Sequence, residues 1–82
     1  MTWIKTKEGM LVNLQYVAQI YATKGGIDAV IVAMNGNFKL CRLWNDKDLS
    51  TIEDMLLFLE QDIAKDNKDI IYMELLEKEL KG

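Results

Sequence analysis

The sequence predicts an α+β domain: an antiparallel β-meander of four or five strands, with one or two C-terminal helices packed on one face of the sheet. Residues 1–44 contain short runs of β-branched and aromatic residues separated by glycine-containing turns. Residues 45–82 instead carry apolar residues at steps of three and four, which is typical of helices. Charge changes at the same point, because the first segment holds five cations and two anions and the second holds five cations and eleven anions. We therefore expect a single domain with a β-sheet half, 1–44, and a helical half, 45–82.

The first strands are expected at Trp3–Lys7 and Leu11–Leu14, where Gly9 supplies the positive φ that a tight hairpin connection requires. Residues Tyr16–Thr23 alternate polar and apolar side chains, which favours a half-buried strand. Residues Gln15–Ala18 are also compatible with a helical turn.

Two further strands are expected at Ile27–Met34 and Phe38–Trp44, joined by Asn35-Gly36 in a type I′ turn. With two-residue loops here and at Gly25-Gly26, one largely apolar face would align Ile20, Ile31 and Leu40, and the helices would cover it. The opposite, half-exposed face would then carry Gln19, Tyr21, Asp28, Val30, Val32, Lys39, Cys41 and Leu43.

A helix is expected to begin at the capping box Ser50-Thr51-Ile52-Glu53. Its apolar stripe, predicted to meet the sheet, consists of Ile52, Met55, Leu56, Leu59 and Ile63. The polar segment Asp66–Asp69 predicts a break, followed by a second helix from about Asp69 to Leu80. One bent helix over residues 50–80 is the alternative.

The composition argues against catalysis. The chain has no histidine, which excludes the commonest general base and every histidine-containing metal site. Its single cysteine, Cys41, lies in an apolar strand and is interpreted as a small buried hydrophobe. The acidic segment 45–54 lacks the glycine and glutamate of an EF-hand loop. We therefore predict no catalytic, cofactor-binding or metal-binding residue and no enzymatic activity.

The same composition predicts a cytoplasmic protein. No apolar run approaches the roughly 18 residues that span a bilayer, and charged residues occupy the N-terminal segment where a signal peptide would be apolar. A single cysteine permits no internal disulfide, which fits a reducing compartment.

Two candidate surfaces remain. A possible protein interface combines the half-apolar sheet face with the apolar C-terminal segment, namely Tyr21, Val30, Val32, Ile71, Met73 and Leu76. A possible anion-binding surface combines aromatic and cationic side chains of the sheet, namely Trp3, Lys5, Lys39 and Arg42.

The opening Trp3-Ile4-Lys5-x-Lys7-x-Gly9-x-Leu11-Val12-Asn13-Leu14, followed by Val17 and Ile20, resembles a group of short bacterial and phage proteins that have no established activity. The resemblance covers about the first twenty residues and implies a few-stranded antiparallel meander closed by a C-terminal helix. It carries no functional residues over to this chain.

The expected function is noncatalytic protein binding by a homo-oligomer, with the chain itself or a host protein as the partner and no membrane partner. A small domain buries little surface by itself, which favours association. One alternative is a phage or mobile-element accessory protein that inhibits or sequesters a host component. The other is a binder of small ligands or single-stranded nucleic acid that uses the cationic sheet, although the calculated pI of about 4.8 makes nucleic acid an unfavourable partner.

Overall fold

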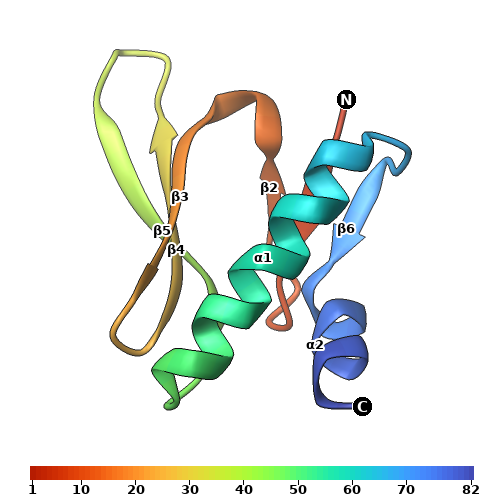
Figure 1. Ribbon diagram of the computed structural model, residues 1–82. Coiled ribbons are helices and arrows are strands. Elements are labelled where there is room, and N and C mark those ends of the chain that lie inside the picture. The colour runs from red at the N-terminus through yellow and green to blue at the C-terminus, as the bar shows by residue number, and fades with distance from the viewer.

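The computed structural model describes residues 1–82 as six strands and two helices (Figure 1). The strands form two separate three-stranded sheets rather than one meander, so the α+β class is confirmed and the single sheet is not. In chain order the elements are β1 (Trp3–Lys5), β2 (Leu11–Asn13), β3 (Val17–Thr23), β4 (Gly26–Val32), β5 (Phe38–Asn45), α1 (Leu49–Lys65), β6 (Ile70–Tyr72) and α2 (Met73–Lys81).

The first sheet has the order β2-β1-β6. The predicted hairpin is confirmed, because β1 and β2 pair antiparallel with Ile4 opposite Val12. Strand β6 was not predicted; it pairs parallel to β1 and places Ile71 opposite Ile4. The helix expected from about Asp69 therefore begins only at Met73. Ile70-Ile71-Tyr72 is β-branched and aromatic, which favours a strand, and in its pairing with β1 Ile71 is fully buried.

The second sheet is the meander β3-β4-β5. It is separated from β2 by a 3₁₀ turn at Leu14–Tyr16, which resembles the helical alternative noted for residues 15–18. The Asn13 side chain accepts a hydrogen bond from the Gln15 backbone N–H (2.9 Å) and stabilises this turn. Because the chain turns here, β3 does not pair with β2, and the expected continuous sheet divides in two.

The β3–β4 register differs from the prediction by two residues. Thr23 pairs with Gly26, so the two-residue loop is Lys24-Gly25 rather than Gly25-Gly26. Ile20 consequently lies opposite Ala29 and not Ile31. Side chains of a strand alternate with a period of two, so this shift leaves the predicted faces of β3 and β4 unchanged.

The β4–β5 hairpin differs by one residue, which has larger consequences. Gly36 has φ 84° whereas Asn35 has a negative φ, so the predicted type I′ turn is wrong. The Gly36 N–H donates to the Ala33 carbonyl (2.9 Å), as in a type I turn followed by a left-handed glycine. A slip of one residue reverses the faces of the returning strand. Cys41 therefore enters the core, and Phe38 and Leu40 lie on the opposite, outer face.

Two separate helices follow. The N-cap of α1 is Asp48 rather than the predicted Ser50, because the Asp48 carboxylate accepts from both the Ser50 N–H (3.3 Å) and the Thr51 hydroxyl (2.8 Å). The Asp48 carboxylate thus satisfies donors of the first turn of α1, the role that the prediction had given to Ser50. Asp66, in the left-handed region with φ 49°, ends α1.

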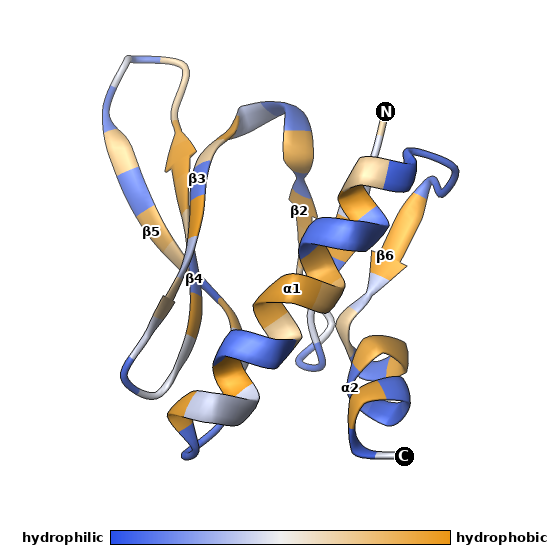
Figure 2. Cartoon of the chain, in the orientation of Figure 1, coloured by the Kyte–Doolittle hydropathy of each residue, from blue (hydrophilic) through white to orange (hydrophobic).

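The core is one contiguous cluster that includes residues of both sheets and both helices. Ile52, Met55 and Leu59 of α1 are fully buried, as the predicted stripe requires, while the hydrophilic residues of α1 alternate with them along the helix (Figure 2). The helix packs against β3, β4 and α2 and leaves the other face of the β3-β4-β5 sheet open. Neither helix has the length and apolar character needed to cross a membrane.

Candidate functional site

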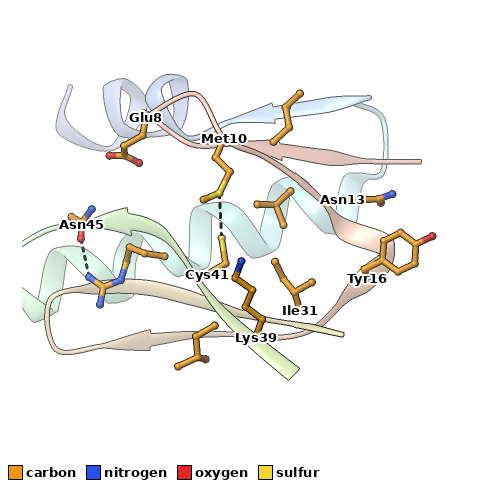
Figure 3. Close-up of a pocket in the computed structure, with 12 residues that line it drawn as sticks. Glu8, Met10, Asn13, Tyr16, Ile31, Lys39, Cys41 and Asn45 are labelled. Carbon is orange, nitrogen blue, oxygen red and sulfur yellow. Dashed lines mark hydrogen bonds between the residues drawn. The ribbon is translucent and has the colours of Figure 1, made fainter. Parts of the chain in front are cut away.

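A cleft of about 680 Å³ lies between the two sheets. One wall is the β1–β2 hairpin, whose strand β2 is the edge of the first sheet, and the other is β5, the edge of the second. Its lining is mainly apolar and includes Met10, Leu11, Val12, Lys39, Leu40 and Cys41. Glu8 and Asn45 lie at one end of the cleft, and Asn13 and Tyr16 at the other (Figure 3).

The inner part of the cleft is formed by Met10 and Cys41, whose sulfur atoms are 4.0 Å apart (Figure 3). The Cys41 side chain is buried, and this desolvation raises the pKa of its thiol above the ordinary value. A neutral thiol is a poor nucleophile and a poor metal ligand. Cys41 is buried, as the sequence indicated, and it contributes apolar surface to the cleft.

The wall formed by β5 presents unpaired backbone groups. The Ala33 N–H donates to the Asn37 carbonyl (2.8 Å), which identifies this pair as hydrogen bonded. Hydrogen-bonded and non-bonded pairs alternate along an antiparallel ladder. The Val32–Phe38 and Val30–Leu40 pairs are therefore non-bonded, and the N–H and C=O groups of Phe38 and Leu40 point away from β4.

Strand β2 also presents unpaired backbone groups to the cleft. The Thr6 N–H donates to the Met10 carbonyl (2.9 Å) and the Leu14 N–H to the Thr2 carbonyl (3.0 Å). The backbone groups of Leu11, which lies opposite Lys5 in a non-bonded pair, consequently point away from β1. Two strand edges with free donors and acceptors thus border one apolar cleft.

The hairpin wall is held in place by Glu77 of α2. Its carboxylate accepts hydrogen bonds from the Lys7 ammonium (2.9 and 3.0 Å) and from the indole N–H of buried Trp44 (2.7 Å). These bonds lower the pKa of Glu77, first through Lys7 and then through Trp44. One carboxylate thereby links the β1–β2 turn, β5 and α2, which fixes both walls relative to each other.

Of the three charged residues that line the cleft, one is ion-paired within the chain and two are not. The Arg42 guanidinium is engaged by the Asp28 carboxylate, the Gly25 carbonyl (3.0 Å) and the Asn45 side chain (2.8 Å). Lys39 on the β5 wall and Glu8 on the hairpin wall have no ion-pair partner in the chain. They are the charges of the cleft that remain free to meet a ligand.

The outer face of the β3-β4-β5 sheet carries a second candidate surface next to the cleft. Cross-strand pairs Val30–Leu40 and Val32–Phe38 lie side by side on this face, and no helix covers them. Phe38 is 70% exposed and Leu40 is 63% exposed. We call Val30, Val32, Phe38 and Leu40 the outer patch.

The chain was compared with protein families, curated proteins and solved structures. None of them matches. Inference about function therefore depends on the geometry of the cleft and the outer patch, and the resemblance of the opening residues to short bacterial and phage proteins stays a prediction.

The structure divides the predicted interface residues into two groups. Val30 and Val32 belong to the outer patch, and half-buried Tyr21 lies on the same face opposite Asp28. In contrast, the structure places three of the predicted residues in the hydrophobic core, where they cannot contact a partner: Ile71, Met73 and Leu76. Their burial results from the unpredicted pairing of β6 with β1 and the packing of α2 behind it.

The predicted anion-binding residues are likewise separated. Trp3 and Lys5 belong to β1 in the first sheet, whereas Lys39 and Arg42 belong to β5 in the second. The Lys5 ammonium lies over the Tyr72 ring, 5.9 Å from its centre. Of the four residues, Lys39 and Arg42 line the cleft, and only Lys39 is without an ion-pair partner there.

The acidic residues after β5 serve the fold. The Asp46 carboxylate accepts from the Asp48 N–H (3.0 Å) and from the Lys81 ammonium (3.0 Å), and the first of these bonds is the main cause of its lowered pKa. Asp48 caps α1. Loop closure and helix capping therefore account for this cluster.

Sequence reasoning missed Phe38 and Leu40, the most exposed residues of the outer patch. It placed them on the covered face because Asn-Gly was assigned to a two-residue loop. The only available signal was that Asn-Gly also suits a three-residue loop with glycine in the left-handed position.

Proposed function

We propose that this protein is a noncatalytic protein-binding domain that self-associates as a homo-oligomer through the outer patch. The observation that supports the proposal is the open, apolar outer face, where Phe38 and Leu40 are largely exposed. Contiguous apolar surface of this kind commonly marks a protein interface. Its central residues carry no charge, while the Asp28–Arg42 ion pair lies at one end as a polar rim would.

The exposed area of the chain is close to that of a monomeric protein of its mass, so the support for association comes from the apolar character of the outer face. A monomeric protein of this mass, 9.5 kDa, is expected to expose roughly 5,000 Å². The isolated chain exposes 5497 Å². Association through the outer face would remove apolar area from water at about 25 cal/mol per Å².

The site chemistry favours binding over catalysis. The neutral, buried Cys41 thiol is the only cysteine, and the cleft brings together no acid and base at hydrogen-bonding distance. General acid–base catalysis needs such groups within about 3 Å of the transferred proton. The free groups of this region instead suit recognition, since they are apolar side chains and backbone donors and acceptors.

The proposal predicts concentration-dependent self-association that a single substitution weakens. Sedimentation velocity from micromolar to millimolar concentration should show the wild-type chain passing from monomer to oligomer. Phe38→Lys should weaken this association by about thirtyfold, because a charge replaces a central aromatic contact worth about 2 kcal/mol.

The matched control is Leu75→Lys on α2, a residue 54% exposed, which makes the same chemical change away from the outer patch. It should associate like the wild type. A wild-type chain that stays monomeric at millimolar concentration would contradict self-association. Equal weakening by both variants would exclude the outer patch as the interface.

A further inference from the structure

We propose that the cleft binds an extended segment of a partner polypeptide, which adds as a strand to the free edge of β5. The segment has apolar residues at alternate positions and a carboxylate beside Lys39. This inference rests on the proposed function, because it names the kind of protein partner that the domain binds. The binding site it concerns is the cleft and not the outer patch.

The backbone of β5 has hydrogen-bonding groups free for a partner strand. Phe38 and Leu40 each offer an N–H and a C=O that no other backbone group of the chain uses. From Phe38 to Arg42 this edge is about 17 Å long at 3.3–3.4 Å per residue, enough to pair with a strand of about five residues. Addition of a strand to such an edge draws its affinity from main-chain hydrogen bonds.

The cleft supplies the side-chain specificity. Alternate side chains of a strand paired with β5 would point inward, toward Met10, Val12 and Cys41. The volume of about 680 Å³ accommodates apolar side chains of ordinary size. The side chains between them would point outward beside Leu40, which borders both surfaces.

The opposite wall restricts what can enter. The β1–β2 hairpin faces β5 across the cleft and is fixed there by the bonds of Glu77 to Lys7 and Trp44. A single extended chain needs room for only one strand beside β5, whereas the edge of a second folded sheet brings its neighbouring strands with it. This favours a peptide segment over a second copy of the domain as the occupant.

Charge complementarity specifies the segment further. Lys39 on the β5 wall lacks an ion-pair partner, whereas the nearby Arg42 is already paired with Asp28. Glu8, also without a partner, lies on the hairpin wall at the end of the cleft near Asn45 (Figure 3). An acidic residue beside Lys39 and a basic residue toward Glu8 would satisfy both charges.

The charge requirement can be tested with defined peptides. The probes are short synthetic peptides of alternating valine and threonine, made soluble by a polyethylene glycol tail. In each probe of the set glutamate replaces one of the valines, because a residue beside Lys39 points inward, as Lys39 and Cys41 do. Binding to the full chain is measured by fluorescence anisotropy. At least one peptide should bind in the micromolar range, and replacing its glutamate by lysine should weaken binding by about fivefold to tenfold. The variant Lys39→Glu should reverse this preference.

The requirement for main-chain hydrogen bonds is tested by changes in the peptide and in β5. Two isomers of the best peptide are N-methylated on alternate residues, so that each loses the donors of one edge; only the isomer whose N–H groups face β5 should bind. Leu40→Pro should weaken binding by about tenfold, because it deletes an outward N–H while leaving the bonds to β4 intact. Leu40→Val, which keeps the N–H, is its control. The peptide isomers keep the test valid should the proline variant fail to fold.

Three results would overturn the inference: no peptide of the set binds, both N-methylated isomers bind equally, or a preference for glutamate survives in Lys39→Glu. Self-association measured in parallel separates this inference from the proposed function. Phe38→Lys should lose self-association and still bind the peptide, because its side chain lies on the outer face and its backbone is unchanged. Self-association without peptide binding would leave the proposed function standing and remove only the strand-addition site.

Discussion

Replacement of Gly26 by alanine is expected to lower the free energy of unfolding by about 3 kcal/mol or more. A Cβ atom at this position would lie 2.0 Å from the Trp44 carbonyl oxygen and 2.8 Å from a guanidinium nitrogen of Arg42. The nearer atom belongs to the backbone of β5, so relief requires the two paired strands to separate where the β4–β5 register already shifts. Thermal unfolding measures the effect, at about 4–8 °C per kcal/mol for a domain of this size.

Gly9→Ala is the informative control for that substitution. No atom lies within 4 Å of a Cβ built on Gly9, but its φ of 94° is unfavourable for alanine. A residue with a side chain in the left-handed region costs about 1–2 kcal/mol. Equal losses in the two variants would show that Gly26 is not crowded by β5, and the described β4–β5 packing would then be incorrect.

Ile71→Ala is expected to cost about 2–5 kcal/mol, the usual range for truncation of a fully buried isoleucine. Ile71 is 1% exposed and lies opposite Ile4 in the parallel β1–β6 pair. The loss should appear in urea unfolding as a lower midpoint with an unchanged slope.

Leu75→Ala tests the same segment from its exposed side. Leu75 is more than half exposed on α2, and its truncation should change stability by no more than about 0.5 kcal/mol. A larger loss at Leu75 than at Ile71 would contradict the strand at residues 70–72. It would instead favour a helix running from Asp69, as the local pattern of the sequence suggests.

Local signals in the sequence were sufficient for much of the fold. Gly9 identified the first hairpin, and the spacing of Ile52, Met55 and Leu59 identified the buried stripe of α1. The β6 strand was missed although Ile70-Ile71-Tyr72 is β-branched and aromatic, because three residues are too few for hydrophobic periodicity to distinguish a strand from the start of a helix. Its pairing with β1 joins segments almost at opposite ends of the chain, and short-range periodicity contains no information about such a contact.

The candidate site was less accessible to sequence reasoning for a specific reason. Val30 and Val32 were correctly placed on one sheet face, but Phe38 and Leu40 were placed on the wrong one. A loop longer by one residue reverses the side chains of β5 from Phe38 to Arg42, and the irregularity between Ile27 and Asp28 then restores the expected register at Trp44. The cleft itself depends on the division into two sheets, with their edges β2 and β5 facing each other. A continuous meander would have contained no such cleft.

The outer patch is proposed to be the surface where two copies of the chain meet. The most direct measurement is an isotope-filtered nuclear Overhauser experiment on an equimolar mixture of labelled and unlabelled chains at millimolar concentration. A symmetric interface places the same residues of both copies together, so contacts are predicted between the Phe38 ring of one copy and the Val30, Val32 and Leu40 methyl groups of the other. Intermolecular contacts confined to another surface, such as exposed Leu57 of α1, would contradict the account.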